Sequence, residues 1–152
     1  MPKTYIVIPA YNEEHGLPPL LETIRGLMER DNRDYRVLVV NDGSRDRTRE
    51  VAEQAAESMP LDVLNHEVNQ NVGAVFRTGI TEACRRAEPG DVVMTIEGDN
   101  TNDASIILDM LARIEEGCDV VVASRYRKGG RFQGFPLMRR IFSNGNGRKK
   151  EK

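Results

Sequence analysis

The sequence has no tryptophan, two cysteines and two histidines among its 152 residues, and no apolar run approaches the roughly 20 residues that span a bilayer. Cys84 and Cys118 form no close pair and stand in apolar contexts, so we expect buried free thiols in a reducing compartment. His15 and His66 belong to no ligand-spaced cluster, which argues against zinc. The apolar stretch at 5–8 is too short for the core of a signal peptide and predicts a first strand.

Charge is divided unevenly along the chain. Residues 1–124 hold 23 acidic and 12 basic side chains, whereas residues 125–152 hold 1 and 10. We expect a folded body at 1–124, a basic segment of the same single domain at 125–147, and a basic tail at 148–152 whose composition predicts disorder. A basic end on an acidic body suits an anionic partner, which leaves phosphate, nucleic acid or a membrane surface open.

Short apolar runs rich in β-branched residues alternate with stretches of helical periodicity. The expected strands are residues 5–8, 35–40, 61–64, 91–96 and 119–123. The clearest helical pattern is Leu17, Leu20, Leu21, Ile24, Leu27 and Met28. This alternation predicts an α/β fold: a three-layer, doubly wound, mostly parallel sheet with helices on both faces and right-handed crossovers.

Polar clusters follow four of the expected strands. They are Tyr11-Asn12-Glu13, Asn41-Asp42-Gly43, Glu97-Gly98-Asp99 and Ser124-Arg125. Ligands of such sheets bind outside the carboxyl ends of the strands, so we expect these clusters at one rim. The first strand is followed by no GxGxxG pattern, and no GxxxxGK[ST] occurs, so the dinucleotide fingerprint and the P-loop are both absent.

The Glu97-Gly98-Asp99 triplet places two carboxylates at the end of an expected buried strand. Their burial costs desolvation unless a cation pairs with them, and Mg²⁺ or Mn²⁺ carrying a phosphate fits oxygen ligands. Gly98 removes a side chain where a ligand would approach the backbone. The alternative is an acidic turn before a helix that Asn102 or Asp103 caps.

Together these clusters resemble the motifs of the family 2 glycosyltransferases, and among them the polyprenyl- or dolichyl-phosphate mannosyltransferase branch. The matching segments, in order, are 7–14, 39–48 (with Asn41 where aspartate is commoner), Asn71-Val72-Gly73 followed by Gly79, Glu97-Gly98-Asp99 in the Asp-x-Asp place, and 124–130 with 139–145 around the lipid-phosphate acceptor. The resemblance covers nearly the whole chain. It implies a glycosyltransferase A type fold, similar to nucleotide-diphospho-sugar transferases, with residues 1–124 binding the nucleotide sugar.

The resemblance also implies roles for individual residues. Donor or acceptor would be bound by Pro9, Tyr11, Glu13, Asp42, Gly73, Arg125, Arg139, Arg140 and Ser143, the metal by Glu97 and Asp99, and catalysis would rest on Asp99 and Arg125. Asp42 is suited to accept a hydrogen bond from a base N–H, and the planar guanidinium of arginine suits phosphate. Glu97 is one methylene longer than the aspartate usual there, and the chain ends soon after Ser143, where the family normally continues.

The implied activity is a metal-dependent, inverting transfer of a hexose to a polyprenyl or dolichyl phosphate, with mannose from GDP-mannose as the expected donor. Mg²⁺ or Mn²⁺ would stabilise the departing diphosphate. An anionic phosphate acceptor needs no strong general base, in keeping with the expectation that no histidine stands at the rim. Because basic residues alternate with apolar ones in 125–140, we expect peripheral binding at the cytoplasmic face of a membrane. The acidic body argues against nucleic acid.

Alternatives remain from the sequence. One is a nucleotide-sugar-binding domain without turnover, and another is a related family 2 transferase that uses UDP-glucose or UDP-GlcNAc. A nucleotidyltransferase usually has a glycine- and lysine-rich loop near the first strand, where this chain has residues 10–13. A receiver-like signalling domain would have a lysine where Arg125 stands.

Overall fold

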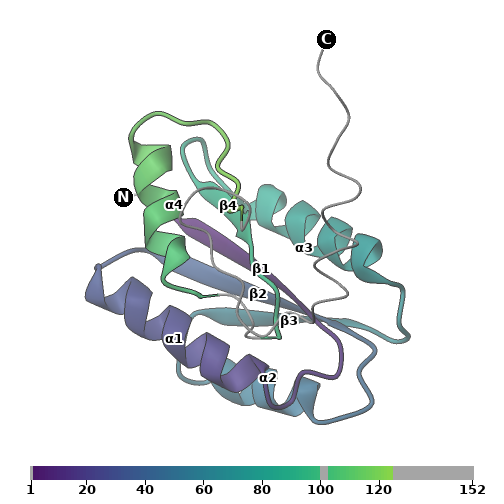
Figure 1. Ribbon diagram of the computed structural model, residues 1–152. Helices are drawn as coiled ribbons and strands as arrows, with labels where there is room; N and C mark the ends of the chain where they lie inside the picture. The colour runs from purple at the N-terminus through teal and green to yellow at the C-terminus, as the bar shows by residue number, and fades with distance from the viewer. Residues whose placement is uncertain (1, 100–102, 125–152) are drawn as a thin grey trace, which may run out of the picture.

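The computed structural model describes residues 2–99 and 103–124 (Figure 1). Strands and helices alternate in this part of the chain: β1 (Thr4–Ala10), α1 (Leu17–Arg30), β2 (Tyr35–Asp42), α2 (Thr48–Ala56), β3 (Leu61–His66), α3 (Val72–Arg86), β4 (Val92–Thr95) and α4 (Ile106–Glu115). The strands form one parallel sheet in the order β3-β2-β1-β4. The α/β fold predicted from the alternation is confirmed.

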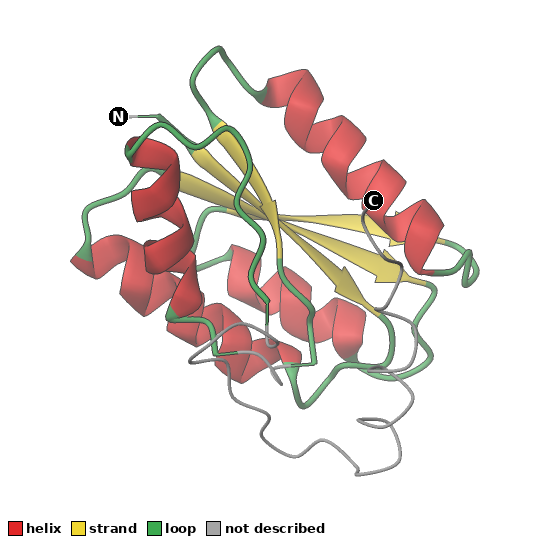
Figure 2. Ribbon diagram, turned by 45° about the horizontal axis from the view of Figure 1, so that its top comes forward, coloured by secondary structure: helices red, strands yellow, loops and turns green. Residues whose placement is uncertain are grey.

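Helices cover both faces of the sheet, as Figure 2 shows. Ile6 and Ile8 of β1 pack in the larger core with α1, α2 and α4, whereas Tyr5 and Val7 pack in a smaller core beneath α3. Successive side chains of a strand point to opposite faces, so β1 contributes to both cores. This explains why β1 is apolar from Tyr5 to Ala10 and does not alternate with polar residues.

Helix α1 follows its sequence pattern closely. The residues it buries are the predicted ones: Leu17, Leu20, Leu21, Ile24, Leu27 and Met28. Two prolines occupy its first turn, where a missing N–H removes no helical hydrogen bond. The helix begins after the loop that leaves β1, so its start helps to set the position of that loop.

Helix α3 lies unusually close to the sheet at Gly79. A Cβ atom at this position would lie 2.3 Å from Val7 Cγ1 and 3.0 Å from Val40 Cγ2. Both contacts come from buried valines of the sheet, which have little room to move. Gly79, part of the third motif, therefore serves the packing of α3 on β1 and β2.

We expect Gly79→Ala to lower the free energy of unfolding by about 1–3 kcal/mol, the usual cost of overpacking a core. Gly26→Ala is the matched control, because Gly26 is also helical, in α1, and a Cβ there meets nothing within 4 Å. The control should raise the free energy of unfolding by about 0.5–1 kcal/mol, since alanine favours the helix. Urea unfolding of both variants measures this, and equal effects would contradict the close packing at Gly79.

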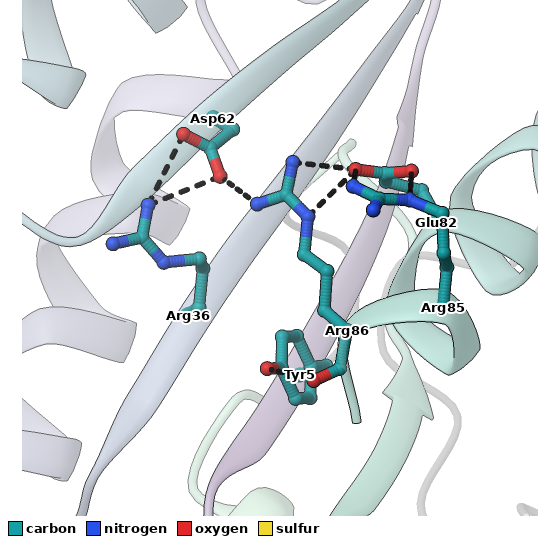
Figure 3. A network of polar contacts seen from close by, with 6 residues as sticks. All are labelled: Tyr5, Arg36, Asp62, Glu82, Arg85 and Arg86. Carbon is teal, nitrogen blue, oxygen red and sulfur yellow. Dashed lines mark hydrogen bonds and ion pairs between the residues drawn. The ribbon is translucent and has the colours of Figure 1, made fainter. Parts of the chain in front are cut away.

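A polar network joins β2, β3 and α3 at the end of the sheet away from the predicted site (Figure 3). Asp62 accepts hydrogen bonds from Arg36 at 3.0 and 3.1 Å and also pairs with Arg86, which in turn pairs with Glu82. Tyr5 donates its hydroxyl to the Arg86 carbonyl oxygen at 3.2 Å. Burial acts to raise the pKa of Asp62, but the two guanidinium groups outweigh it and hold that pKa below its usual value. The network fixes the C-terminal end of α3 on the sheet.

The predicted fifth strand at 119–123 is wrong. Residues 119–124 have no strand structure, and Val120 and Val122 are each 78% exposed. Asp119, Val120 and Val121 line a cavity of about 230 Å³ beside β4. An apolar run favours a strand, but a strand forms only where a neighbour supplies ladder hydrogen bonds, and this segment lies near β4 without pairing to it.

The expectation of two buried thiols is also wrong, because Cys84 and Cys118 are both exposed. Helix α3 buries Val75, Gly79 and Ala83, so Cys84, one residue later, turns away from the sheet. Cys118 lies past the end of α4. Among residues 2–99 and 103–124, no helix combines the length and apolarity needed to cross a membrane.

Candidate functional site

A cavity of about 320 Å³ opens at the carboxyl ends of β1, β2 and β4, beside the start of α3. It is lined by Pro9, Ala10, Tyr11, Glu13, Asp42, Asn69, Asn71, Val72, Val75, Glu97, Gly98 and Asp99. The polar clusters predicted after the first, second and fourth strands thus meet at one rim. Ser124 of the remaining cluster is exposed and does not line this cavity.

The loops after β1 and β2 hold each other in place. The Asn12 N–H donates to Ser44 Oγ at 3.0 Å, and the Arg45 N–H donates to Asn12 Oδ1 at 2.9 Å. The Glu13 N–H donates to Thr48 Oγ1 at 2.7 Å. Asn12 has a φ of 55°, a left-handed conformation that asparagine tolerates. These contacts fix the backbone on either side of Tyr11, which forms part of the cavity wall.

Asp42 ends β2 and is 3% exposed. Its Oδ1 accepts the Gln70 N–H at 2.9 Å and lies 2.7 Å from Nδ1 of His66. Asp42 does not contact the start of α2, where Asp46 Oδ1 accepts the Thr48 N–H at 3.0 Å. Asp42 therefore faces the cavity as a buried carboxylate fixed through one oxygen.

The expectation that no histidine stands at the rim is wrong. His66 ends β3 in register with Asp42, and its Nε2 lies 2.9 Å from Thr78 Oγ1 of α3. The sequence contained the signal: His66 follows a run that pairs with β2, and two parallel strands that end together place their last residues side by side. That inference needed the register, which apolar patterning alone does not supply.

Asn41, the departure from the commoner aspartate, has a structural use. Its Nδ2 donates to Asn65 Oδ1 at 2.9 Å, and its Oδ1 accepts the Ser44 N–H at 3.2 Å. A carboxylate would only accept, so it would place two acceptors opposite each other at Asn65 Oδ1. The amide therefore links the ends of β2 and β3 and supports the turn that follows Asp42.

The acidic wall of the cavity is formed by Glu13, Glu97 and Asp99. Glu97 and Asp99 are exposed, so the expected desolvation cost of burying them does not apply. Gly98 between them is buried, and a Cβ there would lie 2.6 Å from the Pro9 carbonyl oxygen. Its close approach is thus to the chain's own β1 end, whereas the sequence suggested a ligand.

The negative charge of this wall affects the pKa of Glu13. Burial first, and then the nearby Asp99 and Asp46 carboxylates, raise the pKa of Glu13 above its usual value. A Cβ on Gly16 would lie 3.0 Å from Glu13 Oε2 and 3.2 Å from the Asp99 carbonyl oxygen. The loop before α1 and the turn after β4 therefore lie close together. An added cation would relieve this like-charge repulsion.

The wall fits a metal that a diphosphate helps to hold. Residues 2–99 and 103–124 contain no group of three or more Asp, Glu, His or Cys side chains placed to hold an ion alone. Mg²⁺ commonly binds through one or two carboxylates together with substrate phosphates, and Glu97 and Asp99 supply that number. The alternative, a capping role for Asn102 or Asp103, is not supported for Asp103: its Oδ1 accepts the Ser105 N–H at 3.0 Å, but α4 has no side-chain capping hydrogen bond. Asn102 lies outside the described residues.

Some predicted site residues are placed differently or are not described. Gly73 lies in the first turn of α3, where its N–H donates to Asn71 Oδ1 at 3.1 Å, and it does not line the cavity. Asn69, Asn71, Val72 and Val75 line it without having been assigned. The roles predicted for Arg125, Arg139, Arg140 and Ser143, and for the segments 125–147 and 148–152, concern residues outside the part of the chain that the structure describes.

The parallel sheet with its cavity at the carboxyl ends of the strands is an α/β fold that similar solved structures share. The structure of S. aureus TarS 1–349 in complex with UDP-GlcNAc matches with a TM-score of 0.60 at 21% identity, over 84% of this chain and 39% of that one. A second structure of S. aureus TarS 1–349 matches with a TM-score of 0.59 at 23% identity, over 84% of this chain and 40% of that one. The fold is of the glycosyltransferase A type.

The family model for Glycosyl transferase family 2 matches residues 5–152, and this chain belongs to that family. A dolichol-phosphate mannosyltransferase of Pyrococcus furiosus is 30% identical over 143 residues. An undecaprenyl-phosphate 4-deoxy-4-formamido-L-arabinose transferase of Pseudomonas fluorescens is 37% identical over 118 residues. These matches cover 94% and 76% of this chain but only 39% and 33% of the relatives.

Proposed function

We propose that the cavity binds a nucleotide-sugar donor and that the protein transfers the sugar to a polyprenyl phosphate. The observation that carries this proposal is the arrangement of two anionic features in one cavity. Buried Asp42 stands on one side as an acceptor for a base, and Glu97 and Asp99 stand on another as ligands for a diphosphate-bound metal. The acceptor class is supported by the names of both relatives, each a transferase to a polyprenyl-type phosphate.

Different residues of the cavity have different proposed roles in donor binding and transfer. Asp42 accepts a base N–H, and Tyr11 forms a wall of the cavity against the donor. Glu97 and Asp99 would hold Mg²⁺ or Mn²⁺, which supplies stabilisation of the charge that develops on the departing diphosphate. Because the phosphate acceptor is already an anion, its oxygen attacks the anomeric carbon without a general base, and a single displacement inverts that centre. His66, engaged by Asp42 and Thr78, has no such role.

The two relatives support different donor sugars. The sequence predicts mannose from GDP-mannose, and the mannosyltransferase from Pyrococcus furiosus supports that sugar. The arabinose-type transferase is more similar over a shorter stretch and supports a different one. We therefore propose a hexose or a related modified sugar, with mannose as the first donor to test.

A transfer assay tests the proposal. The chain is mixed with GDP-mannose, UDP-glucose or UDP-GlcNAc, Mn²⁺, and a polyprenyl phosphate carried in anionic vesicles. We expect one donor to yield a glycosyl phosphopolyprenol, with the product lost on chelation of the metal. Flotation of the same mixture tests the membrane partner, because the basic residues of 125–140 should hold the chain on vesicles at low salt and release it at high salt.

The opposing result is donor binding without product. It would favour the second candidate, a nucleotide-sugar-binding domain without turnover. The sequence left this candidate open, and the chain spans about 39% and 33% of the length of the two relatives. Failure of every donor to bind would contradict both candidates.

A further inference from the structure

We infer that the cavity selects a base that presents a single N–H between two carbonyl oxygens, the hydrogen-bonding edge of uracil or thymine, and disfavours guanine. This inference rests on the proposed donor site and specifies its ligand. It departs from the GDP-mannose expected from the sequence. The evidence is that hydrogen bonds within the protein occupy Oδ1 of Asp42 and leave Oδ2 for a ligand.

The first carboxylate oxygen of Asp42 is saturated. Oδ1 accepts the Gln70 N–H at 2.9 Å, and His66 Nδ1 lies 2.7 Å away. A carboxylate only accepts, so Nδ1 of His66 carries the hydrogen of that bond. Each carboxylate oxygen has two lone pairs, and both lone pairs of Oδ1 are therefore used by protein donors.

The second oxygen is available to the cavity. In the part of the chain that the structure describes, Oδ2 of Asp42 makes no hydrogen bond, and it is not among the buried polar atoms left without a partner. Asp42 is 3% exposed and lines the cavity, so what remains accessible of this carboxylate opens there. The protein thus offers a base one carboxylate oxygen, held at a fixed position.

The chemistry of the bases distinguishes the ligands. Guanine presents N1–H and N2–H side by side, which match the two oxygens of a carboxylate in a bidentate pair. Here that bidentate pair would require guanine to displace the Gln70 N–H or His66 from Oδ1, because two parallel N–H groups cannot both point in line at Oδ2 alone. Uracil and thymine present only N3–H, which one oxygen satisfies. A guanine would leave a donor unpaired in a partly buried site, and that is costly.

The cavity also supplies donors for the flanking carbonyl oxygens. Asn69 and Asn71 both line it. Asn69 Oδ1 accepts the Asn71 N–H at 3.1 Å, and Asn71 Oδ1 accepts the Gly73 N–H at 3.1 Å. With their oxygens engaged by the backbone, their amide nitrogens are the groups left to donate. One acceptor with amide donors nearby complements an edge of acceptor, donor, acceptor.

His66 acts in this scheme as a positioning residue. It does not line the cavity, but Thr78 Oγ1 at 2.9 Å holds its Nε2 while Nδ1 occupies Oδ1 of Asp42. Removing the imidazole would leave a lone pair on Oδ1 for a second base donor. His66 therefore sets base selectivity through Asp42.

Titration calorimetry on the whole chain with Mn²⁺ tests the inference, using UDP, dTDP, GDP and CDP with pyrophosphate as the base-free reference. We expect UDP or dTDP to bind roughly tenfold or more tightly than GDP, the size of one unsatisfied hydrogen bond. His66→Ala should reduce that ratio by several fold and leave pyrophosphate affinity unchanged. His66→Asn, whose amide nitrogen replaces Nδ1, should restore the ratio.

Each contrary outcome has a separate meaning. GDP binding as tightly as UDP and dTDP, or more tightly, overturns the base assignment and leaves the proposed donor site standing. A ratio unchanged in a folded His66→Ala variant overturns the positioning role of His66. Binding of pyrophosphate with no gain from any base overturns the nucleotide site itself, and with it the proposed function. The ratio in the unmodified chain decides the base even if His66→Ala does not fold.

Discussion

Asp99→Ala should abolish the Mn²⁺-dependent binding of a donor diphosphate while the fold stays intact. Asp99 lines the cavity and is exposed, so its carboxylate contributes little to the core. Its loss removes one of two proposed metal ligands. A metal at a departing diphosphate contributes several kcal/mol to the transition state, so transfer should fall by roughly a thousandfold or more. Calorimetry with a nucleoside diphosphate and Mn²⁺, beside the transfer assay, measures both effects.

The matched control is Asp109→Ala. It removes the same charge from an exposed position on α4, and Asp109 does not line the cavity. This variant should bind the diphosphate as the unmodified chain does. If Asp99→Ala also retained full affinity in Mn²⁺, the metal would lie elsewhere and the role given to Glu97 and Asp99 would be wrong.

The second large effect is expected from Asp42→Asn. Asparagine keeps an oxygen for the Gln70 N–H and His66, and it replaces the cavity-facing acceptor Oδ2 with an amide donor. That donor would oppose the N–H of the base. We expect donor affinity to fall by about 1.5–3 kcal/mol, the range for a hydrogen bond to a charged group, or roughly ten- to 150-fold.

Pyrophosphate separates this effect from a general loss of the site. Its affinity should be the same in Asp42→Asn and in the unmodified chain, because it carries no base. Thermal unfolding of the variant should show an intact fold, since the amide preserves the contacts to β3 and the loop before α3. An equal loss for pyrophosphate would refute the assignment of Asp42 to the base.

Much of the fold was predictable because it depends on local patterns. The buried residues of α1 agree with the sequence pattern at every predicted position, since a 3.6-residue period reports which face is apolar. The strand at 119–123 failed because an apolar run does not reveal whether a partner strand exists. Periodicity also does not fix how far an apolar residue at the margin of a helix face is covered: Ile80 and Ile106 are 39% and 37% exposed.

The site was predictable in outline for a similar reason. The ends of parallel strands lie together in any such sheet, so Pro9, Tyr11, Glu13, Asp42 and Asp99 were expected to meet, and they do. The pairing of His66 with Asp42 depends on strand register and side-chain geometry, which a sequence expresses only weakly. The exposure of Glu97 and Asp99 depends on how the turn leaves β4, and the apolar run before it suggested the opposite.

We propose that one cavity holds the base at Asp42 and the metal-bound diphosphate at Asp99. A crystal structure of the chain with UDP and Mn²⁺, with the manganese located by anomalous scattering, would show both contacts at once. We expect an N3–H bond from the uracil to Asp42 Oδ2, and manganese coordinated by Asp99 and by oxygens of the diphosphate. Nucleotide bound elsewhere, for example in the cavity beside β4, or manganese away from the Asp99 carboxylate, would contradict it.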